Sequence, residues 1–253
     1  MAMFGDVSVA VSESDVAEME LHRPPANFFD TTLLGHLVEA VAWADDAGCR
    51  AVVLCSEGRH FCAGLDFGRS GAPDPDELRT LYDHALAFVD GPLPVVAAVQ
   101  GAAIGGGLGL ALVADFRVAS PGSRLSANFA RLGFHQGFGL SLTLPRAVGA
   151  QQALGLLTTG RRIDGEEAVR IGLCDGLADD PRAGAHALAR EIAASAPLAV
   201  RSIRRTLRAG LVGELTAAVE HERVEQLRLM ETDDFREGIR ASLDRRQPRF
   251  SGR

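Results

Sequence analysis

Two short loops rich in small residues are the parts of this sequence best suited to chemistry. Residues 61–67 read FCAGLDF and residues 101–107 read GAAIGGG. Ala63 and Gly64 let the backbone turn sharply and expose its N–H groups, and the second loop leads into a helix-like segment whose amino end presents N–H groups as well. Two N–H groups from separate loops can form an oxyanion hole, which stabilises negative charge on a substrate carbonyl oxygen.

A glycine triplet alone is weak evidence for such a site. Residues 105–107 equally suit a tight turn or a close approach between two segments. A nucleotide-binding loop is a further alternative, but neither the GxGxxG pattern nor the lysine-bearing P-loop pattern occurs there. The two loops therefore define a candidate oxyanion hole, and a structural role for them stays open.

Buried strands precede both loops and are expected to fix their positions. The apolar runs 51–55 and 94–99 are typical of strands covered on both faces, and each is followed by one of the loops. The predicted strands are 7–11, 16–21, 51–55, 94–99 and 116–119, the first two forming a hairpin. The predicted helices are 31–46, 76–89, 151–157 and 165–171.

The C-terminal part carries no strand signal. The helices predicted there are 185–194, 197–209, 215–230 and 233–243. Because strands and helices alternate first and helices alone follow, the sequence predicts an α/β core with a helical tail. We place the boundary so that residues 1–195 form the core and residues 196–253 form the helical C-terminal region. We expect that region to pack on the core or on a neighbouring subunit.

Composition excludes several classes of function. The chain has 253 residues, 47% of them hydrophobic, and a formal net charge of −7 at pH 7, which argues against a nucleic-acid surface. All 26 basic residues are arginine, so any anion site must use guanidinium or backbone N–H groups. With no apolar run approaching the ~20 residues of a membrane span and no signal sequence at the start, we expect a soluble, cytoplasmic protein.

The four cysteines give no sign of a metal centre or a disulfide. They form neither a CxxC pair nor a zinc-binding spacing. Cys55 lies in an apolar run and has the character of a small core residue. No metal is expected.

With several other segments, the two loops make the chain resemble the crotonase (enoyl-CoA hydratase/isomerase) superfamily. The resemblance covers nearly the whole chain. The other segments that carry it are RPPA (23–26), PVVAAVQG (94–101), ADFR (114–117), LPRAVG (144–149), TGR (159–161) and DFREGI (234–239). It implies a spiral of ββα units and a C-terminal helical region that forms homotrimers, often paired into hexamers.

The resemblance also implies an acyl-CoA thioester as substrate, with no cofactor beyond the coenzyme A that the substrate carries. The N–H groups of Leu65 and Gly106 then form the oxyanion hole and stabilise an enolate. The residues implied to contact coenzyme A are Arg23, Pro25, Ala26, Ala63 and Asp66. For Asp66, capping of the local turn is the alternative role.

The sequence departs from this family where proton transfer takes place. Hydratases of the family use two glutamates, and the matching positions here hold Gly109 and Phe129. A carboxylate used by some isomerases and dehalogenases matches Gly137, and an aspartate of the synthases matches Gln136. None of these four side chains can act as a base near pH 7. Ordinary two-glutamate hydration is therefore not expected.

Two residues are candidates to replace the missing groups. His135 belongs to a loop that faces the pocket by resemblance, and its ordinary pKa suits acid–base work, although a structural role in that loop is the alternative. Tyr82 lies on the predicted helix 76–89, before the buried strand 94–99, and either lines the pocket or packs within the fold. Phe129 and Phe138, together with Phe134, are expected to give the acyl pocket an aromatic wall.

Two functions remain open on this evidence. The first is an enzyme of the enoyl-CoA hydratase/isomerase type, a lyase or isomerase of fatty-acid metabolism, acting on an acyl-CoA through an enolate. The second is a non-catalytic protein that binds or senses acyl-CoA. The candidate oxyanion hole favours the first, and the missing glutamates favour the second.

Overall fold

A seven-stranded sheet runs through the middle of the protein, whose computed structural model describes residues 1–253 except for the side chain of Ser70. Its order is β1 (Ala2–Phe4), β2 (Val7–Val11), β3 (Val16–Leu21), β4 (Ala51–Ser56), β5 (Val95–Val99), β7 (Phe116–Ala119) and β9 (Gly176–Leu177). The first three strands are antiparallel neighbours, and from β3 onward all pairs are parallel. A second, two-stranded parallel sheet pairs β6 (Ala102–Ile104) with β8 (Arg124–Ser126).

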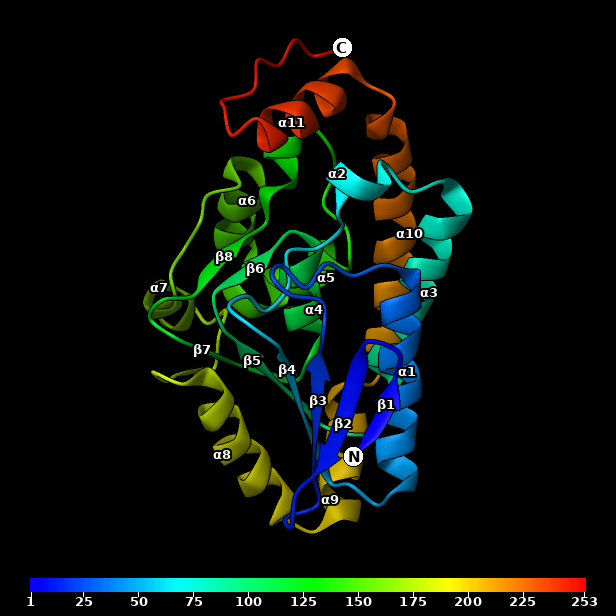
Figure 1. The fold of residues 1–253 in the computed structure, drawn as a ribbon, viewed down its shortest axis with the longest axis vertical. Helices are drawn as coiled ribbons and strands as arrows, with labels where there is room; N and C mark the ends of the chain where they lie inside the picture. Colours follow the sequence, from blue (N-terminus) through cyan, green and yellow to red (C-terminus); the bar gives the residue numbers. More distant parts are fainter.

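Both faces of the parallel part are covered, which explains the unbroken apolar runs. Side chains of β4 alternate between two clusters: Val52 and Leu54 point into the larger core, and Val53 and Cys55 into a smaller one. The smaller cluster lies under α8 (Pro181–Ala193), which contributes alanines that allow the helix to approach closely (Figure 1).

The larger core lies between the sheet and a set of helices on its other face. Three of them, α1 (Thr31–Asp46), α3 (Pro75–Asp90) and α10 (Leu211–Met230), pack side by side in the order α1, α3, α10 (Figure 1). The side chain of Asp30 accepts a hydrogen bond from the Leu33 N–H at 2.8 Å and so begins α1. The remaining helices are α2 (Phe67–Ser70), α4 (Gly106–Val113), η1 (Asn128–Leu132), α5 (Leu140–Val148), α6 (Ala150–Thr159), α7 (Gly165–Arg170), α9 (Pro197–Leu207) and α11 (Asp233–Leu243).

The predicted strands and helices are all present, with ends that differ by at most a few residues. The elements missing from the prediction are α5, which has nine residues, and the short elements β1, β6, β8, β9, α2 and η1. Such short segments carry too few residues for a periodic pattern. Helix α11 lies above α2 at one end of the molecule (Figure 1) and contacts α2 and η1. Helix α10 contacts both α3 and α5. The division of the chain at residue 195 stays a prediction.

Among the described residues, none of the helices combines the length and the apolar character that crossing a bilayer requires.

Candidate functional site

The two small-residue loops lie side by side because backbone hydrogen bonds join them. The Cys62 N–H donates to the Ala102 carbonyl at 3.0 Å, and the Ile104 N–H donates to the Cys62 carbonyl at 3.0 Å. A Cβ atom on Gly107 would lie 2.0 Å from the Cys62 oxygen, so only glycine permits this approach. The pairing fixes how the two loops face each other.

Several N–H groups at this junction donate to no acceptor among the described residues, and two of them are of interest here. They belong to Leu65 and Gly106, and neither donates a hydrogen bond within the protein. Gly106 is the first residue of α4, where the N–H has no partner inside the helix. Both residues line one cavity of about 320 Å³. Two such donors beside one cavity can stabilise negative charge on an oxygen atom.

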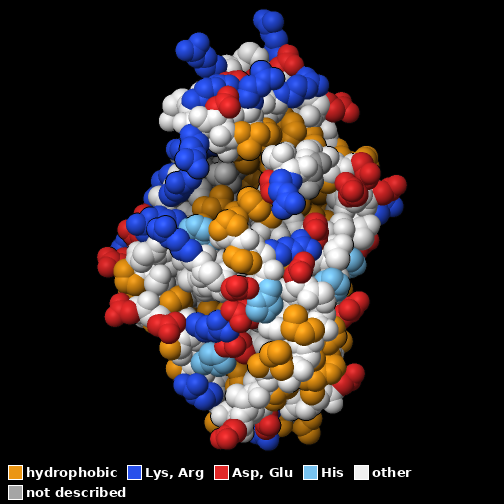
Figure 2. All heavy atoms as spheres, viewed as in Figure 1, with side chains coloured by type: hydrophobic (Ala, Val, Ile, Leu, Met, Phe, Trp, Pro, Cys, Tyr) orange, Lys and Arg blue, Asp and Glu red, His pale blue; other side chains and the backbone are white. Residues whose placement is uncertain are grey.

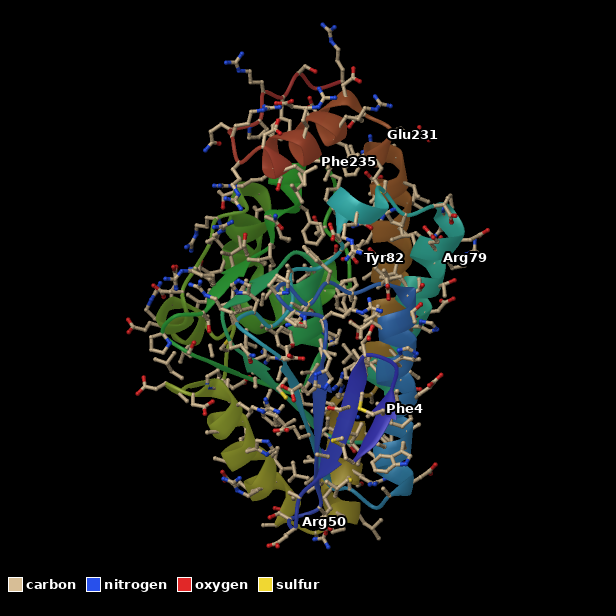
Figure 3. All side chains as sticks on the ribbon, viewed as in Figure 1. Phe4, Arg50, Arg79, Tyr82, Glu231 and Phe235 are labelled. Carbon is tan, nitrogen blue, oxygen red and sulfur yellow. The ribbon has the colours of Figure 1, made fainter. Side chains whose placement is uncertain are left out.

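Several aromatic side chains line the cavity. Phe29 and Phe138 lie with ring centroids 5.1 Å apart, and Phe129 and Phe134 with centroids 5.3 Å apart. Phe235 of α11 packs on Phe134 at 5.3 Å and closes this side of the core (Figure 3). Figure 2 shows the hydrophobic side chains gathered in a hollow on this face. Such a wall excludes water and strengthens any hydrogen bond formed inside.

A buried pair of polar side chains lies in the same wall. Tyr82, labelled in Figure 3, donates from its hydroxyl to the Oε1 of Gln226 at 2.6 Å. The Nε2 of Gln226 in turn donates to the His135 carbonyl at 3.0 Å. Burial raises the pKa of the Tyr82 phenol, which therefore stays protonated and acts as a hydrogen-bond donor.

One helical turn before Gln226, a buried carboxylate holds the start of α5. Glu222 is fully buried, and its two oxygens accept hydrogen bonds from the N–H groups of Gly139 and Ser141, each at 2.7 Å. Burial raises the pKa of this carboxyl to about 7, against the lowering effect of the hydrogen bonds. Phe138 directly precedes Gly139 and has a φ of 61°. Because Glu222 holds the Gly139 N–H, it also constrains the position of Phe138.

Neighbouring side chains fill the space beside two glycines of the site. A Cβ atom on Gly109 would lie 2.6 Å from the Cβ of Phe138. On Gly137 it would lie 2.1 Å from the Tyr82 hydroxyl and 2.4 Å from the Nε2 of Gln226. Neither position has room for a side chain unless these neighbours move.

Most residues predicted for the site come together in the structure. Those that line the cavity are Ala63, Leu65, Asp66, Tyr82, Gly106, Phe129 and Phe138. Arg23, Pro25 and Ala26 line an adjoining hollow of about 880 Å³, which shares Leu65 and Asp66 with the cavity. What these residues bind stays a proposal.

Among the described residues, His135 lines neither the cavity nor the adjoining hollow. Its ring stacks edge-on against His221 with centroids 5.8 Å apart, and its Nδ1 lies 2.8 Å from the Gln136 carbonyl. The preceding residue, Phe134, packs in the aromatic wall against Phe129 and Phe235. The structural role considered for His135 fits this position better than proton transfer.

Two charged residues of the predicted site form hydrogen bonds or ion pairs within the protein. Asp66 accepts hydrogen bonds from the Gly68 and Arg69 N–H groups at 3.1 and 3.2 Å, which is the capping role considered from the sequence. Arg23 forms ion pairs with Asp6 and Asp30 at 2.7 and 2.8 Å. Its guanidinium is therefore largely compensated before any ligand arrives.

Sequence reasoning missed Glu222, Gln226 and Arg162, of which the last two line the cavity. The buried face of α10 consists of Leu215, Val219, Glu222 and Gln226, so polar residues at core positions of a helix were the available signal. Within the part of the chain that the structure describes, no cluster of three or more His, Cys, Asp or Glu side chains is placed to hold a metal ion.

Comparison with known proteins identifies the family. The enoyl-CoA hydratase/isomerase family model matches residues 12–253. The chain belongs to this family. The α/β fold with C-terminal helices, predicted from the resemblance, is confirmed by a crystal structure of an enoyl-CoA hydratase/isomerase from Pseudoalteromonas atlantica, with a TM-score of 0.86 and 29% identity over 97% of this chain and 100% of that one.

Relatives with curated names are similar over almost their whole length. A probable enoyl-CoA hydratase of Bacillus subtilis is 33% identical over 97% of this chain and 98% of its own. A probable enoyl-CoA hydratase of Mycobacterium tuberculosis, echA14, is 38% identical over 90% of this chain and 91% of its own.

Proposed function

We propose that the chain binds an acyl-CoA thioester and polarises its carbonyl through the N–H groups of Leu65 and Gly106. One observation carries this proposal: two N–H groups without acceptors, held side by side by paired loops, adjoin one aromatic cavity. Negative charge that moves onto the thioester oxygen as an enolate forms is stabilised by these donors. Loss of one such donor typically costs roughly 3–4 kcal/mol of transition-state stabilisation.

The adjoining hollow at Arg23, Pro25 and Ala26 is the proposed place of coenzyme A. It shares Leu65 and Asp66 with the cavity, so a thioester can reach from one to the other. The acyl group then lies against Phe129 and Phe138, where burial of apolar surface favours binding by roughly 25 cal/mol per Å². Membership of the enoyl-CoA hydratase/isomerase family supports the same class of ligand.

We infer further that the reaction, if the chain is an enzyme as its family suggests, proceeds without the two glutamates of the hydratases. By the family resemblance, Gly109 and Phe129 match the positions of those glutamates, and Phe138 fills the space beside Gly109. The enzyme would be a lyase or isomerase whose proton transfer uses a group other than these.

A non-catalytic acyl-CoA-binding protein is the second candidate, and a specific observation favours it. Among the described residues that line the cavity, the ionisable side chains are Asp66, Tyr82 and Arg162. Asp66 caps α2, Tyr82 stays protonated, and arginine is not a base near neutral pH. A binder needs the two N–H donors and the cavity but no such base.

Infrared difference spectroscopy of crotonyl-CoA labelled with ¹³C at the thioester carbonyl tests the polarisation directly. Two hydrogen bonds to the oxygen weaken the C=O bond, so the bound ester should absorb at lower frequency than the ester in water. Gly107→Ala, which pushes the Cys62 carbonyl away from α4, should abolish the shift, and Gly155→Ala, which meets no neighbour within 4 Å, should retain it. A bound ester with an unshifted carbonyl would refute the oxyanion hole.

Turnover separates the two candidate functions. Enoyl-CoA esters of several lengths are incubated with the protein, and hydration, double-bond migration and exchange of the α-protons with deuterated water are followed by mass spectrometry. Any of these reactions supports an enzyme. A shifted carbonyl with no reaction supports a binder, and failure to bind any ester excludes both.

A further inference from the structure

A second hollow, rich in arginine, adjoins the cavity at a place distinct from the one proposed for coenzyme A. We name it the arginine pocket: it has a volume of about 760 Å³ and lies between η1, residues 160–162 and the end of α11. Asn128, Leu132, Arg162 and Ser242 line both it and the cavity. The hollow at Arg23 shares none of these four with the cavity.

The described lining of the arginine pocket includes five guanidinium groups and no carboxylate. They belong to Arg131, Arg161, Arg162, Arg245 and Arg246. Figure 2 shows basic side chains gathered along the edge of this face and up to its C-terminal end. In a chain of net charge −7, a hollow with positive charge only is a marked local departure.

Carboxylates outside the pocket neutralise two of these groups. Glu167 receives two hydrogen bonds from Arg161 at 2.9 and 2.8 Å, and Glu237 receives two from Arg246 at 2.6 and 2.8 Å. These two arginines are therefore compensated, and they are less available to a ligand.

No carboxylate of the described residues pairs with the other three guanidinium groups. Arg131 donates only to the Thr159 carbonyl, at 2.7 Å. For Arg162 and Arg245 the described part of the chain offers neither an ion pair nor a side-chain hydrogen bond within range. Arg162 is the decisive one, because it lines the cavity itself and brings a positive charge without an ion-pair partner to a wall whose other charged side chain, among the described residues, is Asp66.

We propose that the arginine pocket binds an anionic group at the far end of the acyl chain, so that the preferred ligands are monothioesters of dicarboxylic acids. The inference rests on the proposed function, which places the thioester at Leu65 and Gly106 and coenzyme A at Arg23. An acyl chain that runs through the aromatic cavity then ends at Arg162. Guanidinium groups bind carboxylates through paired, charge-assisted hydrogen bonds, and the chain has no lysine to do this instead.

Titration calorimetry with esters matched in chain length tests the proposal. Adipyl-CoA and hexanoyl-CoA both carry six acyl carbons and differ in the terminal carboxylate; glutaryl-CoA and suberyl-CoA extend the series to shorter and longer chains. At low ionic strength the dicarboxylic ester of best-fitting length should bind at least tenfold more tightly than its monocarboxylic partner. That preference should shrink as salt is added.

Arg162→Gln and Arg245→Gln should each remove most of the preference. Arg245→Gln, which lies in the arginine pocket but not in the cavity, should also leave hexanoyl-CoA binding within twofold. Arg50→Gln is the matched control: it deletes the same charge at the opposite end of the molecule (Figure 3) and should change neither affinity. Equal affinity of both ester classes for the unaltered protein, with hexanoyl-CoA still bound, would overturn this inference alone. If neither ester binds, the proposed function fails as well.

Two further outcomes would reassign the pocket. If Arg162→Gln weakens adipyl-CoA, hexanoyl-CoA and free coenzyme A equally, the anion is a phosphate of coenzyme A and the inference is wrong. If it changes the mass of the protein in light scattering and not the ester preference, the pocket faces a second copy of the chain, and the inference is wrong again.

Discussion

Gly137→Ala offers the sharpest test of how the cavity wall is built. The added methyl carbon would lie 2.1 Å from the Tyr82 hydroxyl and 2.4 Å from the Gln226 Nε2, well inside contact distance. Overpacking of a core by one carbon typically costs roughly 1–3 kcal/mol, and displacement of Tyr82 also breaks its buried hydrogen bond to Gln226, for about 1 kcal/mol more. The expected loss of unfolding free energy is therefore about 3 kcal/mol.

Tyr82→Phe should lower the free energy of unfolding by itself, but should offset part of the destabilisation caused by Gly137→Ala when the two are combined. Alone it leaves the Oε1 of Gln226 buried without a donor, for about 2 kcal/mol. In the Gly137→Ala background it removes the very atom that the new methyl group meets. The double variant should therefore be about 2 kcal/mol more stable than the sum of the two single effects, a coupling of the size seen between residues in contact.

Urea unfolding, followed by circular dichroism with a common m-value, measures all three variants. Gly155→Ala is the control, since its methyl group meets nothing within 4 Å and should stabilise α6 by up to about 1 kcal/mol. Effects of Gly137→Ala and Tyr82→Phe that add within about 0.5 kcal/mol would show that the two residues do not share this space.

Three further predictions concern single groups. The pKa of Glu222 is raised from an ordinary 4.5 to about 7, so between these pH values the folded protein binds more protons than the unfolded chain. The free energy of unfolding should therefore fall as pH rises through this window, by up to roughly 3 kcal/mol. Urea titrations at several pH values measure this profile, and Glu222→Gln should flatten it. His135→Ala should leave the affinity for hexanoyl-CoA within twofold by calorimetry, because the ring lies outside the cavity, and a tenfold loss would contradict this placement. All four cysteines are buried, and burial raises the pKa of Cys62 to about 12, so an aromatic disulfide reagent at pH 8 should modify no thiol of the native protein and four after denaturation.

The parts of the site that the sequence predicts are those set by local backbone chemistry. The loops at 61–67 and 101–107 are recognisable from small residues that follow a buried strand, taken together with the family resemblance, and the structure brings both to one cavity. Phe129 and Phe138 were placed by resemblance, and their rings do form the wall. The structure places the His135 ring against His221, a contact that no periodic pattern in a loop predicts.

Long-range contacts explain what sequence reasoning did not find. Gln226 meets Tyr82 across 144 positions of the chain, and Glu222 meets Gly139 across 83. The helix that carries both was predicted, but a helical period alone does not say which element its polar core positions will face. Arg162 was missed for a related reason, since a single arginine in a loop has no pattern until the cavity beside it is known.

The polar groups of the cavity are arranged for holding a ligand more than for moving protons. Tyr82 and Gln226 occupy the space beside Gly137, and Phe138, fixed through Glu222, occupies the space beside Gly109. A carboxylate introduced at either glycine would therefore meet a packed wall. In the proposed complex, the far end of the ligand meets the positive charge of Arg162, which contributes affinity and selectivity, while two backbone N–H groups polarise the thioester. An enolate forms when a base takes the α-proton or when carbon dioxide leaves the α-carbon. Because Asp66 caps α2 and Tyr82 stays protonated, reactions of the second kind are the ones to seek first, ahead of hydration, which requires a base to activate water.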